Sequence, residues 1–196
     1  MQNDLLMKEF VIDLLKKDIP SNYYYHNYTH TVYVVQKVEE IGRHEKCNSD
    51  ELRLLKTAAL WHDTGFIHTY IDHEEAGCEL TRKHLPAYGY TPEEIEMICG
   101  MIMATKIPQR PGNKLEEIIA DADLEYLGTN AAAAKAEDLF KELQLVRPPL
   151  SKKDWNKIQV SFLEQHDYFT DYCKKQGEPG KNVYLKQLIE NQLPEG

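Results

Sequence analysis

Hydrophobic residues recur along almost the whole chain at spacings of three and four, which is the pattern of helices with one buried face. The alternating pattern of a strand is nearly absent, and glycine, proline or clusters of polar residues separate the segments. We therefore predict an all-α protein, a bundle of about eight or nine helices. The predicted helices span residues 3–18, 27–45, 50–63, 73–87, 92–104, 114–128, 131–145, 152–172 and 181–192.

Residues that favour helix N-termini stand at four of the predicted starts. These N-cap candidates are Asp50, Asp72, Thr91 and Ser151. Thr91 has the fullest signature, because Pro92 follows it at the first helical position and Glu94 stands three residues on. The clearest loop, residues 106–113, lacks the composition of a flexible linker between domains. We therefore predict one helical domain over residues 1–196.

Two of the predicted helices carry histidines on their apolar stripes. In the helix over residues 27–45, the stripe projected towards the N-terminus reaches His30 and then His26, so both imidazoles should face the interior. In the next helix, the stripe leads to His62 in the last turn, with Asp63 beside it. The pattern therefore predicts that polar side chains from two helices point into the core.

The predicted helix over residues 114–128 contains two aspartates that are two positions apart. Asp123 lies four residues after Ile119, and so on the same apolar face. Asp121 instead shares a face with charged residues such as Glu117, and we expect it to be exposed. The helical wheel therefore selects Asp123 as the carboxylate that points into the protein.

A buried carboxylate needs a partner, because the removal of its charge from water costs several kcal/mol. Asp63 and Asp123 both need one, while His30 and His62 approach the same interior. Imidazole nitrogens and carboxylate oxygens together suit a divalent first-row metal and leave coordination positions for water. The alternative is that each histidine is an ordinary core residue, but this explanation must account for four residues together.

The composition and net charge of the chain limit the partners that it would bind and the compartment in which we expect it. Of the 196 residues, 42% are hydrophobic, which is enough for a buried core. A formal net charge of -9 disfavours long nucleic acids and anionic membrane surfaces as partners. No apolar run reaches the length of a membrane span, and the first residues lack the pattern of a secretion signal, so we expect a cytoplasmic protein. The four cysteines form no CxxC pair, as expected of reduced thiols.

An ordered set of three motifs resembles the HD-domain superfamily of metal-dependent phosphohydrolases. The motifs are YHNYTH over residues 25–30, WHDTG over residues 61–65 and DADLEYLG over residues 121–128. A His-Asp pair alone has little specificity, whereas the full set in this order has much more. The resemblance covers about residues 22–128 and implies the HD helical bundle. The C-terminal extension, residues 129–196, is similar to that of small bacterial HD phosphohydrolases, with lower specificity.

The resemblance implies that His30, His62, Asp63 and Asp123 are metal ligands, so the family pattern selects the same aspartate as the helical wheel. It also implies hydrolysis by a metal-activated water, for which Asp63 would orient the water or take its proton. His26 resembles the first histidine of the YHN motif in related cyclic-nucleotide phosphodiesterases, where this residue protonates the leaving oxygen. An ordinary packing role for His26 is the alternative.

The resemblance bears on the number of metals and on substrate contacts. Two-metal HD proteins usually supply further histidines between the doublet and the last aspartate. His73 resembles the first of them, but the second is replaced near Lys106. We therefore expect one divalent ion, which Mn2+, Co2+, Ni2+, Fe2+, Zn2+ or Mg2+ would satisfy. His73, Lys106 and Arg110 are candidate substrate-binding residues, the latter two because basic side chains hold phosphate. The alternative is that all three are solvated surface residues.

The leading hypothesis is a cytoplasmic, metal-dependent phosphohydrolase that acts on a small phosphorylated molecule, with a nucleotide or nucleotide-derived signal favoured. One alternative is a degenerate HD domain that senses a ligand or partner without turnover, because a fold does not determine a function. Another is an oxidative enzyme with two irons, which the missing histidine disfavours. We expect neither long nucleic acids nor membranes as partners, and the sequence permits a homodimer.

Overall fold

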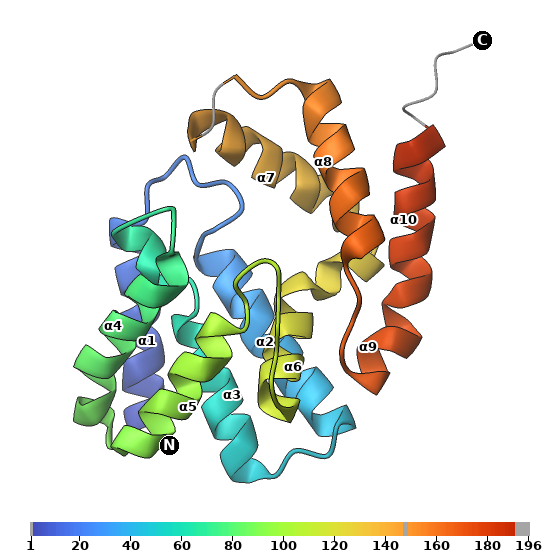
Figure 1. The fold of residues 1–196 in the computed structure, drawn as a ribbon. Helices are drawn as coiled ribbons and strands as arrows, with labels where there is room; N and C mark the ends of the chain where they lie inside the picture. The colour runs from blue at the N-terminus through green and yellow to red at the C-terminus, as the bar shows by residue number, and fades with distance from the viewer. Residues whose placement is uncertain (1, 147–148, 191–196) are drawn as a thin grey trace.

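Helices form all the regular structure in the residues that the computed structural model describes, which are residues 2–146 and 149–190 (Figure 1). The first six α-helices are α1 (Gln2–Asp18), α2 (Tyr28–His44), α3 (Ser49–Trp61), α4 (His73–His84), α5 (Pro92–Met103) and α6 (Lys114–Leu124). They are followed by α7 (Ala132–Val146), α8 (Lys152–Gln165), α9 (Asp171–Gln176) and α10 (Glu178–Glu190). Short 3-10 helices, η1 (Thr64–Ile67), η2 (Leu85–Tyr88) and η3 (Glu125–Gly128), follow α3, α4 and α6. The predicted all-α class is confirmed. Across these two ranges, no helix combines the length and apolar character needed to cross a membrane.

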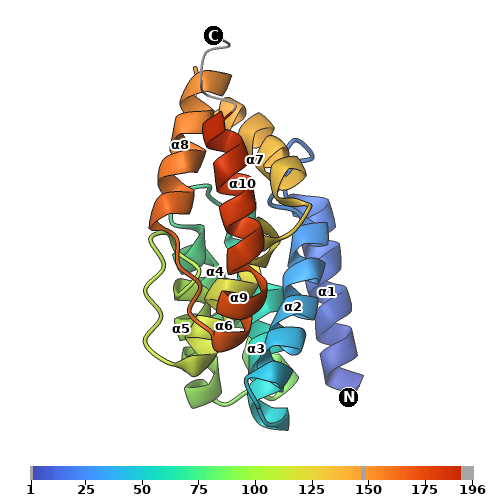
Figure 2. The same ribbon diagram turned by 90° about the vertical axis from the view of Figure 1, so that its right-hand side faces the viewer.

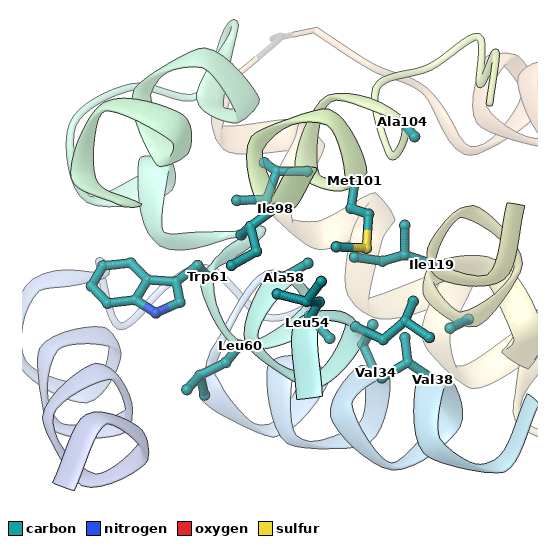
Figure 3. Close-up of a cluster of buried hydrophobic side chains, with 14 of the residues drawn as sticks. Val34, Val38, Leu54, Ala58, Leu60, Trp61, Ile98, Met101, Ala104 and Ile119 are labelled. Carbon is teal, nitrogen blue, oxygen red and sulfur yellow. The ribbon is translucent and has the colours of Figure 1, made fainter. Parts of the chain in front are cut away.

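The main hydrophobic core lies among α2, α3, α5 and α6 (Figure 3). Each of these helices contributes residues with no exposed surface, including Val34, Val38, Ala58, Ile98 and Ile119. Because α2 packs along both α3 and α6, the apolar stripes of these three helices face one another. Polar side chains at the ends of the stripes are therefore carried to the same interior.

The helices α7, α8 and α10 form a second layer at one end of the molecule (Figures 1 and 2). Phe140, Trp155 and Tyr184 of this C-terminal layer belong to a second apolar cluster, which also contains Tyr25 and Tyr126. Tyr25 precedes α2 and Tyr126 follows α6, so both lie within the sequence motifs. The second cluster therefore joins the C-terminal layer to the segments that bear the motifs.

Gly65 permits a very close approach after the His-Asp doublet. A Cβ atom at this position would lie 1.8 Å from the carbonyl oxygen of His73, which is far inside van der Waals contact. Only glycine therefore allows η1 to lie directly against the start of α4. As a result, the Nε2 atom of His73 lies 3.7 Å from Oδ1 of Asp63.

The N-cap predictions are correct at two of the four positions. Thr91 and Ser151 each accept a hydrogen bond from a backbone N–H in the first turn of α5 and α8. Asn48 rather than Asp50 caps α3, because the helix begins one residue earlier than predicted. Asp72 precedes α4 in the left-handed conformation and makes no side-chain cap bond.

The predicted single helix over residues 152–172 is wrong, because α8 and α9 are separate helices joined by an extended segment. Thr170 Oγ1 accepts a hydrogen bond from the backbone N–H of Cys173 and thereby caps α9. A carboxylate of α6 accepts hydrogen bonds from the backbone N–H groups of Thr170 itself and of the preceding Phe169. These polar contacts hold the segment out of helical geometry, and the spacing of apolar residues does not reveal them.

Candidate metal centre

Side chains from α2, α3 and α6 converge on one point beneath the surface. His30 lies in the first turn of α2, His62 directly follows α3, and Asp123 lies in the last turn of α6. Each offers a nitrogen or oxygen atom within 4.8 Å of those of the other two. Oδ1 of Asp123 is 2.9 Å from Nε2 of His30 and 3.6 Å from Nε2 of His62. Both histidines are 1% exposed, and the structure thus places three donor side chains around one small volume.

Asp63 lies at the edge of this group. Its Oδ1 atom is 3.2 Å from Nε2 of His62, and its Oδ2 atom is 3.7 Å from Nε2 of His30. The residue is buried, and Oδ2 has no hydrogen-bond partner among the described residues. A buried oxygen left without a donor is costly, so this atom is available to a cation or to water. All four predicted ligands therefore lie together in the structure.

His62 is held in the tautomer that a metal ligand requires. Its Nδ1 atom lies 2.8 Å from the carbonyl oxygen of Ala59, and a carbonyl oxygen only accepts, so Nδ1 carries a proton. The Nε2 atom is buried and has no hydrogen-bond partner in the described part of the chain. Metal-binding histidines usually make this type of bond through the other ring nitrogen. The residues present therefore fit a divalent metal ion.

The electrostatics of the group favour positive charge at its centre. Burial alone would raise the pKa of both Asp63 and Asp123, but the neighbouring histidines hold the pKa of each well below its usual range. Burial alone would lower the pKa of His62, but the two carboxylates raise that pKa overall. Two largely buried carboxylates that stay ionised require compensation, which comes from protons on the histidines or from a bound cation. A single divalent ion between the two carboxylates would compensate the charge of both.

His26 lies beside the group but not on α2. Asn27 caps α2 by accepting a hydrogen bond from the backbone N–H of Thr29, so His26 precedes the helix. The prediction that it shares a helix face with His30 is therefore wrong. Its ring nevertheless lies 6.3 Å from the ring of His30, between centroids, and stacks on Phe66 at 4.2 Å. The extended segment before the helix, rather than helical spacing, places His26 near the metal-ligand candidates.

A cavity of about 350 Å³ opens beside the four converging residues. Its polar lining includes His26, Asp63 and Asp123. Much of its apolar lining comes from α7 and α8 of the C-terminal layer, including Trp155 and Phe162. A space of this size accommodates a small organic molecule. The arrangement therefore joins a set of metal-ligand candidates to a place for a substrate.

The three candidate substrate-binding residues lie in different surroundings. His73 lines the cavity, and burial lowers its pKa to about 4. Nζ of Lys106 lies 2.7 Å from Asp72 Oδ1 and 2.5 Å from Glu75 Oε1. Arg110 is exposed in the loop that follows α5. Neither basic residue is among the described residues that line the cavity. Substrate binding by these three residues stays a prediction.

Asp121 corrects the helical-wheel argument. It is 0% exposed instead of lying on the charged face. Its carboxylate accepts hydrogen bonds from the backbone N–H groups of Phe169 and Thr170, both at 2.8 Å, and from the Thr170 hydroxyl at 2.6 Å. The wheel compares neighbours on one helix and cannot show a partner so distant in sequence. Asp121 therefore anchors the segment before α9, while Asp123 faces the histidines.

Glu142 is a residue of the site that the sequence does not reveal. Its side chain on α7 is fully buried, and its carboxylate accepts a hydrogen bond from the ring of His26. The backbone N–H groups of Tyr25 and His26 also donate to it, at 2.9 and 3.1 Å. In the sequence it is one of several charged residues on an amphipathic helix, and no motif surrounds it.

Comparison with known proteins gives the family. The family model for the HD domain matches residues 27–125. A predicted HD superfamily hydrolase from an uncultured Thermotogales bacterium has a similar crystal structure, with a TM-score of 0.63 and 21% identity over 93% of this chain and 89% of that chain. Bacillus subtilis YpgQ, solved in complex with ADP, gives a TM-score of 0.69 and 16% identity over 99% of this chain and 96% of that chain. No curated protein matches the sequence. Because the family match spans half of the chain and includes all four converging residues, it confirms the family expected from the motifs: the chain belongs to the HD domain family.

Proposed function

We propose that the protein is a metal-dependent phosphohydrolase that hydrolyses a phosphate ester of a small molecule, with nucleotides as the substrate class. The observation that carries this proposal is the convergence of His30, His62, Asp63 and Asp123 beside a cavity of about 350 Å³. Membership of the HD domain family supports hydrolysis, and a structural neighbour solved with ADP supports a nucleotide.

One divalent ion would be held by the two histidine nitrogens and by oxygens of the two aspartates. When bound, such an ion lowers the pKa of a water molecule and polarises a phosphoryl oxygen. The mixed nitrogen and oxygen donors suit Mn2+, Co2+, Ni2+, Fe2+ or Zn2+, and Mg2+ would depend more on the carboxylates. The geometry of these residues and the tautomer of His62 support this metal-binding role.

Two residues of the cavity wall would move protons. Asp63 would accept a proton from the attacking water, because its Oδ2 atom has no hydrogen-bond partner in the described ranges. His26 would donate a proton to the leaving oxygen. Burial lowers its pKa, but the hydrogen bond with Glu142 and the nearby carboxylates raise that pKa overall, which favours the protonated ring that a proton donor needs. The products are then the free alcohol and phosphate.

The lining of the cavity favours a substrate with a planar, apolar part. Trp155, Phe162 and Leu143 come from the C-terminal layer and face the same space as the carboxylates. Aromatic and aliphatic walls bind a nucleobase better than a strongly hydrated sugar phosphate, because the sugar would lose its hydrogen bonds to water. The organic part of a nucleotide would therefore occupy the apolar end of the cavity.

A substrate panel tests this function. Protein stripped with a chelator would be reloaded with Mn2+, Co2+, Ni2+ or Mg2+ and assayed against nucleotides, cyclic dinucleotides and sugar phosphates. We expect hydrolysis only in the presence of a divalent ion, and faster hydrolysis of nucleotides than of sugar phosphates. Binding of nucleotides without any turnover across the whole panel would instead favour the alternative of a ligand-sensing HD domain.

Replacement of His26 by alanine should preserve the metal and lower kcat in a way that depends on the leaving group. For an ester of ribose we expect a loss of about 10²–10⁴-fold, as is typical of a missing general acid. For p-nitrophenyl phosphate the loss should be small, because p-nitrophenolate departs without protonation. The exposed His68, replaced in the same way, is the control. Uniform loss on both substrates, or loss of the metal, would assign His26 a packing or ligand role.

A further inference from the structure

The carboxylate of Glu142 is surrounded by hydrogen-bond donors. Oε2 accepts from the backbone N–H groups of Tyr25 and His26, at 2.9 and 3.1 Å. Oε1 accepts from the ring Nδ1 of His26 and from the hydroxyl of Tyr70, the latter at 3.0 Å. These donors come from the segment before α2 and from the segment between η1 and α4. Both oxygens are therefore fixed, and so are the backbone and the ring of His26.

The pairing of Glu142 with His26 also affects the charge of both side chains. Among the described residues, the ion-pair partner of this fully buried carboxylate is His26. Burial would raise the pKa of Glu142, but its hydrogen bond with His26 and the charge of that ring lower the pKa overall. Since a buried carboxylate without a cation is costly, the arrangement favours an ionised glutamate next to an imidazolium. The contact with Glu142 thus favours a proton on Nδ1 of the His26 ring.

The orientation of the His26 ring leaves one of its two nitrogens available to contact a substrate. Because Nδ1 is bonded to Glu142, Nε2 is the nitrogen available to a ligand, and the ring of His26 lines the cavity. Stacking on Phe66, with the two ring planes 29° apart, holds the ring in place. The carboxylates of Asp63 and Asp123 line the same cavity. The other titratable rings around the His26 ring, by centroid distance, are those of Tyr25 at 4.7 Å, Tyr70 at 5.9 Å, His73 at 6.1 Å and His30 at 6.3 Å.

We propose that Glu142 is a positioning residue that holds His26 as a proton donor, so that the C-terminal layer completes the active site. This inference rests on the proposed function. As the attacking water forms a bond to phosphorus and loses its proton to Asp63, the bond from phosphorus to the leaving oxygen breaks. Nε2–H of His26 then gives its proton to that oxygen, and Glu142 remains ionised throughout. In serine hydrolases a buried aspartate orients its histidine in a comparable way.

Glu142 lies outside the part of the chain that is common to HD domains. The family model matches residues 27–125, whereas Glu142 lies on α7, beyond that range. The metal-ligand candidates therefore belong to the common HD segment, while the residue that orients the proton donor comes from the extension.

The variant Glu142→Gln tests the inference in the metal-loaded, full-length protein. The amide still offers an oxygen to one set of donors but carries no charge. We expect kcat for a ribose phosphate ester to fall by about 10²-fold or more, and kcat for p-nitrophenyl phosphate to change by less than about threefold. His26 must be protonated to act, so activity is lost as pH rises through its pKa. That alkaline limb should move to lower pH in the variant.

A second readout does not depend on activity. Titration of the His26 ring nitrogens by NMR in the metal-free protein should give a lower pKa in Glu142→Gln than in the wild type. Glu142→Asp keeps the charge at a shorter reach, so it should restore most of the pKa while kcat stays intermediate. Glu137→Gln, on the same helix with a side chain that is 44% exposed, is the matched control and should change neither quantity.

Two results would overturn the positioning role of Glu142. One is an equal loss of kcat on both substrates in folded Glu142→Gln that retains its metal. The other is a His26 pKa that does not differ between the wild type and this variant. If the wild type hydrolyses no substrate with any metal, the proposed function fails and the proton-donor role fails with it. The titration would still decide whether Glu142 controls the charge of His26.

Discussion

Replacement of Asp123 by alanine is expected to remove the bound metal and to lower the rate of phosphate-ester hydrolysis by at least about 10³-fold. One of its oxygens lies within 3.6 Å of both histidine nitrogens, so its loss removes a ligand that both of them face. Without that oxygen, the site loses a negative charge and several kcal/mol of charge stabilisation for the reaction. Metal content after dialysis and kcat under saturating metal are the measurements.

A matched variant separates this effect from general damage to α6. Glu117 stands on the same helix, away from the cavity lining, and its replacement by alanine should leave both metal content and kcat unchanged. If Asp123→Ala retained one equivalent of metal with wild-type affinity, Asp123 would not be a ligand and the ion would have to be held by other residues.

Replacement of Asp121 by alanine is expected to destabilise the protein without removal of the metal. The carboxylate accepts three hydrogen bonds, two of them from backbone N–H groups that would be left without a partner. Such a loss costs about 3 kcal/mol, which for a chain of this size lowers Tm by about 6–12 °C. Thermal unfolding and metal content, measured on the same preparation, give the two quantities.

The conservative variant Asp121→Asn sharpens this test, because the amide oxygen still accepts from one backbone N–H group and the loss of stability should be smaller. Equal loss of metal in folded Asp121→Ala and Asp123→Ala would mean that the two carboxylates are not distinguished in the way that their contacts indicate.

The residues that the sequence placed correctly near one another are those on long apolar stripes. His30, His62 and Asp123 each continue a stripe of α2, α3 or α6, and these three helices pack together. Burial of such stripes is the main driving force for helix packing, so residues at their ends are carried with them. The motif order then indicated the family, and the family match confirmed it.

The residues that the sequence misplaced or missed are fixed by polar contacts rather than by apolar packing. His26 is not helical, because Asn27 caps α2. The helix and its apolar stripe therefore begin after His26. Asp121 and Glu142 are charged residues that are buried because backbone N–H groups distant in sequence donate to them. Such contacts depend on tertiary structure and leave no periodic pattern. For the same reason, the break between α8 and α9 could not be predicted.

The anomalous signal of Mn2+ in crystals of the protein tests most directly whether the four motif residues hold a metal. We expect a single peak, with His30 and His62 coordinated through Nε2 and with oxygens of Asp63 and Asp123 at about 2.0–2.2 Å. A peak elsewhere would contradict the proposed metal centre. So would a fully occupied ion that lies more than about 6 Å from any of these four side chains, because that distance is well beyond the reach of a direct ligand.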